Sequence, residues 1–76
     1  MKYTDRLKQL REQSGLNQTQ IAKMLNYGQT AYSKWELGQR DIAIDNLIKL
    51  AQFYNVDMNY ITGITDKRKP FPNKKG

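Results

Sequence analysis

Two short helices joined by a tight turn are predicted for QTQIAKMLNYGQTAYSKWEL, residues 18–37, and this stretch constrains the fold more than any other. Asn17 can cap the first helix with its side-chain oxygen, and Gln20 stands three residues later, as a capping box requires. Apolar residues then recur at helical spacing at Ile21, Ala22 and Leu25. The stretch is therefore expected to bury one stripe against the rest of the chain.

The turn and the second helix follow from residue type. Asn26 is expected to end the first helix because Asn tolerates the left-handed conformation, and Gly28 is expected to permit a sharp bend. In the next helix Tyr32 and Trp35 face one way, and a polar set faces the other: Gln29, Thr30, Ser33 and Lys34. Such donors and acceptors suit base edges in a major groove, but any surface helix can carry them, so the face alone does not decide function.

Three further helices are predicted around this pair. The first covers Thr4–Ser14, with Thr4 as its cap and Gly15 at its end. The fourth covers Ile44–Tyr54, where helical spacing predicts a core stripe of Ile44, Leu47, Ile48, Ala51 and Tyr54. Asp57 can cap a short last helix that closes at Gly63. With no strand signal, the fold class is all-α with five helices.

Length and composition exclude several classes of protein. The 76 residues suffice for one small domain, which has little apolar material to enclose a ligand cavity. The chain has no Cys and no His, so we expect no metal site and no cofactor, and neither Ser14 nor Ser33 has a histidine partner for catalysis. An enzyme is thus the least supported class. No apolar run spans a bilayer, so a cytoplasmic protein without membrane contact is expected.

The net charge of +6 favours a polyanionic partner but is unevenly placed. Residues 64–76 contribute +4 of it, through five basic residues and Asp66. Pro70 and Pro72 prevent a helix there, so a flexible basic tail is expected. Because such tails are often only solubilising, the charge gives weak support for nucleic-acid binding.

The strings GLNQTQIAKML and QTAYSKWELG closely resemble the repressor and Cro type (XRE-like) of helix-turn-helix protein found in phages and bacteria, over about Lys2 to Gly63. The resemblance implies a compact five-helix bundle of the phage repressor DNA-binding domain type in residues 1–63, with residues 64–76 a disordered basic tail. It also implies a sequence-specific double-stranded DNA-binding transcriptional regulator. Most simply, this is a repressor that binds an inverted-repeat operator as a homodimer.

The same resemblance assigns roles to individual residues. Base reading falls to Gln29, Thr30, Ser33 and Lys34, and phosphate binding to Asn17, Gln18, Gln39 and Arg40. Arg11, near the end of the first helix, is expected to pair with Glu36 after the recognition helix. No residue is expected to be catalytic or to bind a metal.

Three places depart from the family pattern. Tyr27 stands where a buried valine is usual, so it must either find room inside or turn outward. Leu37 replaces a polar or basic residue, which removes one possible phosphate contact. Ile42 and Ala43 replace a proline and a serine, and we expect a weaker cap on the fourth helix.

One rival function stays open, which is a protein-binding module such as an antitoxin or regulatory partner. An exposed apolar surface made of Met58, Tyr60, Ile61 or Ile64 would mark such a protein-binding site. The simpler expectation is that most of these four complete the core.

Overall fold

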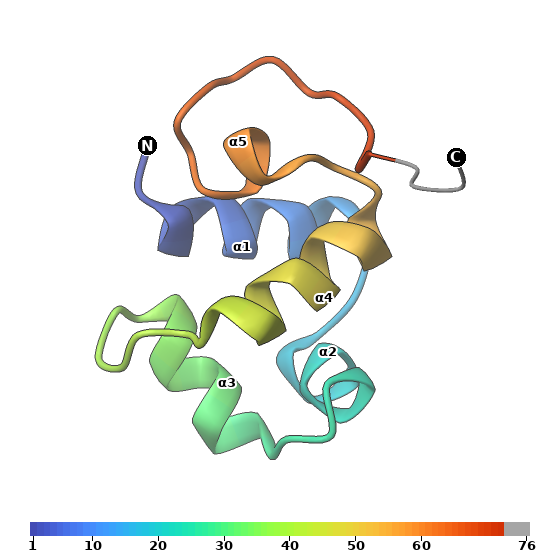
Figure 1. Cartoon of the computed structure of the whole chain (residues 1–76). Coiled ribbons are helices and arrows are strands. Elements are labelled where there is room, and N and C mark those ends of the chain that lie inside the picture. The colour runs from blue at the N-terminus through green and yellow to red at the C-terminus, as the bar shows by residue number, and fades with distance from the viewer. Residues whose placement is uncertain (73–76) are drawn as a thin grey trace.

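Five helices and no strand make up residues 1–72, which are the residues described in the computed structural model (Figure 1). They are α1 (Tyr3–Gln13), α2 (Gln18–Met24), α3 (Gln29–Glu36), α4 (Ile44–Tyr54) and α5 (Met58–Ile61). In Figure 1, α2 and α3 lie together at one end of the molecule, and α5 lies beyond α1 at the other. The all-α, five-helix fold expected from the sequence is confirmed.

One hydrophobic core joins all five helices. Its buried members are Leu7, Leu10, Ile21, Ala22, Leu25, Tyr32, Trp35, Leu47, Leu50, Ala51, Tyr54, Val56, Tyr60 and Ile61. Full burial of a large apolar side chain contributes about 1.5–3 kcal/mol, so this cluster supplies the main driving force for folding. The predicted stripe of α4 needs two corrections. Ile44 at its first turn is 60% exposed, and Ile48 is only half-buried, while Leu50 lies in the core instead.

The predicted helix ends are mostly confirmed. The Asn17 Oδ1 accepts from the Gln20 backbone N–H at 2.8 Å, and the Gln20 Oε1 accepts from the Asn17 backbone N–H at 2.9 Å. The Asp57 Oδ1 accepts from the Tyr60 N–H at 2.9 Å, so α5 also has a side-chain cap. Asn26 ends the turn after α2 with the expected positive φ, 66°.

Two expectations about helix starts are wrong. Lys2, not Thr4, is the N-cap of α1, because Tyr3 already belongs to the helix. The Tyr3 hydroxyl accepts from the Ile42 N–H at 3.3 Å, which links the start of α1 to the segment before α4. Gly28 is the N-cap of α3 with φ −80° and ψ 160°, an extended conformation open to any residue. The bend before α3 therefore does not depend on the conformational freedom of glycine.

Residues 64–72, which we call the C-terminal strap, correct part of the expectation of a disordered tail. The Asp57 N–H donates to the Lys69 carbonyl at 2.8 Å, and the Phe71 N–H donates to the Asn55 Oδ1 at 3.3 Å. The Phe71 ring packs against the core. In Figure 1 the strap arches over α5 and α1, at the end of the molecule away from α2 and α3. Residues 73–76, with Lys74 and Lys75, lie outside the described residues.

No helix within residues 1–72 combines the length and apolar character needed to cross a membrane. Over the same residues no group of three or more His, Cys, Asp and Glu side chains could hold a metal ion.

Candidate nucleic-acid interface

The outer face of α3 presents the four residues assigned to base reading. Gln29 and Thr30 are exposed, and Ser33 and Lys34 are half-buried along the same helix. Tyr32 and Trp35 on the inner face are buried in the core, with their rings edge to face at 5.9 Å between centroids. Because an eight-residue helix is only about 12 Å long, a rigid inner face fixes the outer face as well.

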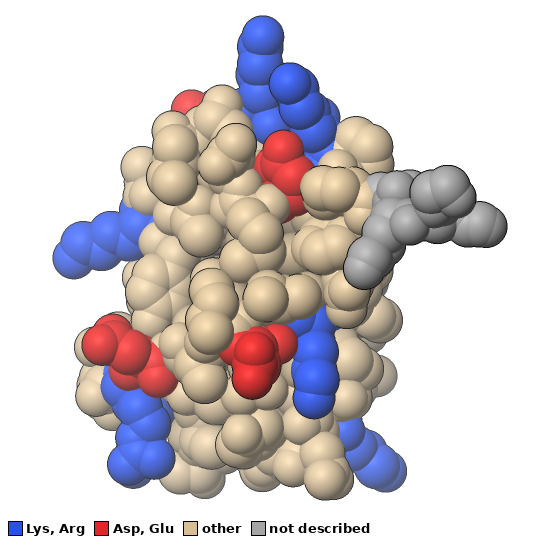
Figure 2. All heavy atoms as spheres, viewed as in Figure 1, with Lys and Arg blue, Asp and Glu red and all other residues tan. Residues whose placement is uncertain are grey.

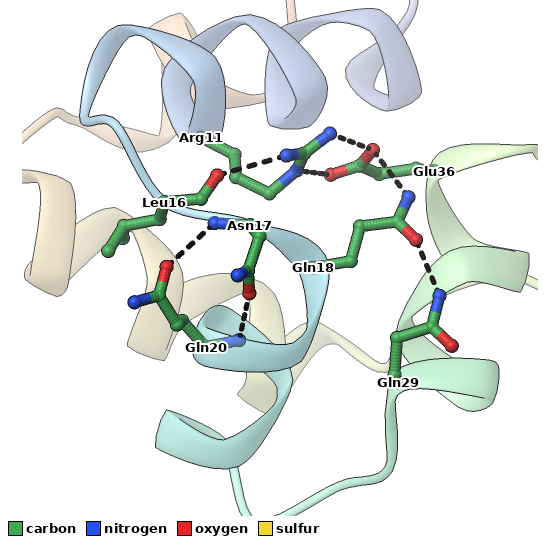
Figure 3. Close-up of polar contacts among 7 residues, drawn as sticks. All are labelled: Arg11, Leu16, Asn17, Gln18, Gln20, Gln29 and Glu36. Carbon is green, nitrogen blue, oxygen red and sulfur yellow. Dashed lines mark hydrogen bonds and ion pairs between the residues drawn. The ribbon is translucent and has the colours of Figure 1, made fainter.

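Arg11 and Glu36 lie together, and they tie α1 to the end of α3 (Figure 3). The Arg11 Nε donates to the Glu36 Oε2 at 2.7 Å, and the Arg11 Nη2 donates to the Glu36 Oε1 at 3.1 Å. The remaining nitrogen, Arg11 Nη1, donates to the Leu16 carbonyl at 3.0 Å. A paired geometry of this kind is the strong form of an arginine–carboxylate contact, and it also restrains the loop before α2.

Burial and hydrogen bonding oppose each other at Glu36. Burial alone would raise the pKa of the Glu36 carboxyl, but the hydrogen bond from Arg11, with further help from the neighbouring Tyr32 and Gln18, lowers that pKa below its ordinary value. The same Arg11–Glu36 hydrogen bond raises the pKa of the Arg11 guanidinium. Burial, and then the nearby carboxylate, raise the pKa of the Tyr32 hydroxyl. At neutral pH Glu36 is therefore an ionised carboxylate inside the domain, and it only accepts hydrogen bonds.

Gln18 and Gln29, one assigned to phosphate and the other to bases, bond to each other (Figure 3). The Gln18 Nε2 donates to the Glu36 Oε1 at 3.2 Å, and the Gln29 Nε2 donates to the Gln18 Oε1 at 2.8 Å. A row of hydrogen bonds thus runs from Arg11 through the buried carboxylate and Gln18 to Gln29, the first residue of α3. Sequence reasoning missed this row, because it depends on how closely α2 and α3 approach.

The other residues assigned to phosphate lie on the surface near these helices. Asn17 is exposed beside Gln18, with its Oδ1 occupied by the cap of α2. Gln39 and Arg40 lie in the turn after α3, where both backbone N–H groups donate to the Lys34 carbonyl at 2.9 and 3.3 Å. Their exposed side chains make no hydrogen bond within residues 1–72, so both can reach a ligand.

Tyr27 turns outward, which settles the alternative left open by the sequence. Its side chain is 45% exposed, its ring meets Trp35 edge to face at 5.0 Å, and its hydroxyl accepts from the Asn46 Nδ2 at 3.2 Å. Leu37 is also exposed, and Ala43 caps α4 without a side-chain bond, as expected for these departures from the family. Tyr27 therefore braces the turn against α3 and α4 from outside.

Charge does not single out α3 on the face shown in Figure 2. Lys and Arg side chains gather at the end where Figure 1 places the strap, whereas the half of the molecule that holds α2 and α3 shows both acidic and basic groups on a largely uncharged surface. The strap residues Lys67, Arg68 and Lys69 are exposed at the end away from α3. Net charge alone therefore does not identify the interface.

A profile of the helix-turn-helix family matches residues 7–61, which span the start of the core in α1 to the end of α5. The chain belongs to the helix-turn-helix family. This match confirms the resemblance that was read from the strings around α2 and α3. The placement of α3 after a capped α2 and a tight turn is the structural form of that family motif.

Curated relatives of this helix-turn-helix chain have names that refer to transcription. It is 33% identical over 73 residues to the uncharacterized HTH-type transcriptional regulator YobD of Bacillus subtilis, covering 96% of this chain and 65% of that protein. The HTH-type transcriptional regulator ImmR of the same organism is 40% identical over 58 residues, 76% of this chain and 46% of that protein. The HTH-type transcriptional activator BcrR of Enterococcus faecalis is 34% identical over 59 residues, 78% of this chain and 29% of that protein.

The chain thus spans less than two thirds of the length of each of these three relatives. No solved structure gave a significant match to the chain.

Proposed function

We propose that this helix-turn-helix chain is a sequence-specific double-stranded DNA-binding transcriptional regulator that inserts α3 into the major groove. Base edges are contacted by Gln29, Thr30, Ser33 and Lys34, and backbone phosphates by Asn17, Gln18, Gln39 and Arg40. The names of the relatives support a role in transcription. The chemistry of the α3 face supports DNA as the ligand.

The restrained amide of Gln29 carries this proposal. One N–H of its Nε2 bonds to Gln18, which leaves the second N–H and the Oε1 for a base. Adenine offers an acceptor at N7 and a donor at N6 in the major groove, so a glutamine amide can bond to both. A side chain that is already held in place loses little conformational freedom on binding, which favours both affinity and selectivity.

A repressor that occupies an operator is the simplest form of this function, and it needs no cofactor. One small module contacts few base pairs, so two copies on an inverted repeat, with half-sites about 34 Å apart, provide useful affinity. A duplex with two half-sites is expected to bind two chains cooperatively, and a duplex with one half-site to bind a single chain weakly. Sedimentation of the two complexes measures the difference, and equal affinity per half-site on both duplexes would contradict dimeric binding.

The alternative function, a protein-binding module, has less support. Of its four candidate surface residues, Tyr60 and Ile61 are buried in the core, Met58 is half-buried, and only Ile64 is exposed, at 76%. A single exposed isoleucine is ordinary for a soluble surface.

Binding sites selected from random duplex DNA, followed by affinity measurements on the selected site, test the proposal. Gln29→Ala is expected to lower affinity for the selected site by about 5- to 150-fold and to relax preference at one base pair per half-site. Gln52→Ala is the matched control, since Gln52 is an exposed glutamine near the far end of α4. Selection that yields no enriched sequence, or equal losses for the two variants, would contradict base reading by α3.

A further inference from the structure

We propose that Glu36, whose side chain is buried, sets the direction in which Gln29 presents its amide to DNA, with Gln18 as the intermediate. The inference rests on the proposed function and assigns Glu36 a positioning role in base selectivity. It follows from the order of donors and acceptors in the row of hydrogen bonds that links the three residues (Figure 3).

The first step concerns the carboxylate. Its Oε2 accepts from the Arg11 Nε, and its Oε1 accepts from the Arg11 Nη2 and the Gln18 Nε2. An ionised carboxylate has no hydrogen to donate, so Gln18 can bond to it only through the NH₂ group of its amide. The Glu36 side chain is 3% exposed, so water cannot readily take the place of this contact.

The second step concerns the two amides. With its NH₂ group turned to Glu36, Gln18 turns its Oε1 towards Gln29, and the Gln29 Nε2 donates to that oxygen at 2.8 Å. The reversed amide of Gln29 would bring two acceptor oxygens together, which is unfavourable at this distance. The carboxylate therefore determines the orientation of Gln18, and Gln18 determines that of Gln29.

The third step concerns the base. In the orientation set by Glu36, Gln29 offers an acceptor, Oε1, and one remaining N–H, which match adenine N6 and N7. In the reversed orientation the free end of Gln29 would offer only N–H donors, which match the two acceptors of guanine, O6 and N7. The row of bonds therefore favours adenine over guanine at the base pair read by Gln29.

Glu36→Gln tests this directly, because a carboxamide of the same shape can either donate or accept. The wild type is expected to prefer adenine over guanine at this base pair by about 5- to 150-fold, and Glu36→Gln to reduce that ratio to within a few fold. Selectivity at the base pairs read by Ser33 and Lys34 is expected to stay unchanged. Retention of the full adenine preference in Glu36→Gln overturns the inference.

A double variant provides the rescue. Gln18→Glu added to Glu36→Gln places an acceptor-only group next to Gln29 again, so the adenine preference is expected to return. The added negative charge near phosphate lowers affinity for every sequence, so the ratio of affinities is the quantity that recovers. If the double variant keeps the reduced adenine-to-guanine ratio of Glu36→Gln, the row of hydrogen bonds is not the cause of the adenine preference.

Two controls separate positioning from folding. Arg11→Lys weakens the ion pair but keeps the carboxylate, so it is expected to lower the unfolding midpoint without changing the adenine preference. If Glu36→Gln does not fold, Gln18→Met interrupts the row and leaves the Arg11–Glu36 pair intact, and it is expected to relax the same ratio. The inference is contradicted if Arg11→Lys reduces the preference for adenine over guanine, or if Gln18→Met keeps that preference in full.

Nuclear magnetic resonance of the free protein distinguishes failure of the inference from failure of the proposed function. The side-chain amide protons of Gln29 are expected to shift and to exchange faster with water in Glu36→Gln, and to recover in the double variant. If the Gln29 side-chain amide signals are the same in Glu36→Gln as in the wild type, Glu36 does not orient Gln29, and the inference fails whether or not the protein binds DNA. Changed signals in a protein without sequence preference leave the row in place and reject the proposed function.

Discussion

Two arginines of α1 bind carboxylates far along the chain, and the two pairs differ in exposure to solvent. Arg11 and Glu36 are 12% and 3% exposed, with 2.7 Å between Nε and Oε2. Arg6 and Asp66 are 2% and 90% exposed, with 2.8 Å between Nη2 and Oδ1. The distances are almost equal, so we expect any difference in the stability that the two pairs contribute to come from burial of the acid and not from contact length.

The other neighbours of the two arginines strengthen this contrast. Arg6 lies over the Tyr60 ring at 3.8 Å and also donates to the Thr65 carbonyl and to Gln9, each at 3.2 Å. It therefore keeps partners when Asp66 is removed. Arg11 without Glu36 would keep only the Leu16 carbonyl. The pair beside α3 is thus expected to contribute more to stability, because Arg6 keeps Gln9, the Thr65 carbonyl and the Tyr60 ring without Asp66. The buried Arg6 Nε itself has no hydrogen-bond partner within residues 1–72.

The largest effect is expected for Glu36→Ala. Removing one partner of a buried pair costs about 3–5 kcal/mol of unfolding free energy, because Arg11 keeps its charge without a counter-charge. Asp66→Ala is expected to cost less than Glu36→Ala, because Asp66 is 90% exposed and Arg6 keeps the Thr65 carbonyl, Gln9 and the Tyr60 ring as neighbours. Urea denaturation of both variants measures the difference. Similar midpoints for the two would show that exposure does not separate the pairs.

Acid titration sharpens the same contrast. The pKa of Glu36 is lowered in the folded state, so its contribution to stability is complete above the ordinary value of 4.5 and is lost as pH falls through the folded pKa. The polar groups around it are Arg11, Gln18 and Tyr32, with Tyr54 of α4 near enough to be affected by its charge. Wild type is expected to lose stability below pH 4.5 more steeply than Glu36→Gln. Parallel stability curves for the two proteins would contradict this.

Arg6→Met is expected to have the next largest effect and to act on the strap. The variant keeps an unbranched apolar stem but loses bonds to Asp66, Thr65 and Gln9 and the contact with the Tyr60 ring. A cost of about 1.5–3 kcal/mol is expected from charged hydrogen bonds in a buried position.

Hydrogen exchange locates that loss. Protection of the Asp57 N–H, which donates to the strap at Lys69, is expected to fall in Arg6→Met and to persist in Asp66→Asn. DNA selectivity is expected to be the same in both, since the strap and α3 lie at opposite ends of the molecule (Figure 1). A change of the preferred DNA sequence in Arg6→Met would show that the strap region influences sequence preference, and would contradict the separation of the two regions.

The sequence was informative where interactions are local. The cap of α2 at Asn17 and Gln20, the cap of α5 at Asp57 and the left-handed Asn26 all depend on neighbours within a few residues, and all were predicted. The resemblance added the expectation that Arg11 and Glu36 pair, although 25 residues separate them.

What sequence could not predict depends on tertiary approach. Arg6 stands next to Leu7 in a helix with many charges, and nothing local marks it as the more buried of the two arginines. The prolines of residues 64–72 exclude a helix but do not exclude a segment held by a few backbone bonds and one phenylalanine. The Gln18–Gln29 contact likewise requires the relative placement of α2 and α3. Each of these features is a contact between elements, and the spacing of apolar residues along the sequence does not predict such contacts.

The smallest predicted effect on stability concerns the N-caps of α3 and α5, which differ between the two regions. α5, next to the strap, has the Asp57 cap, whereas α3 begins at Gly28 without a side-chain bond. A Cβ atom added at Gly28 meets nothing within 4 Å, and its φ of −80° suits any residue. Gly28→Ser is therefore expected to raise the unfolding free energy by a few tenths of a kcal/mol, through a bond to the first turn of α3. Gly28→Ala, which adds the same Cβ without a hydroxyl, is expected to lower stability because alanine is a poor N-cap. If thermal denaturation shows both variants to be more stable than wild type, the gain comes from the unfolded chain, and the missing cap is not what limits α3.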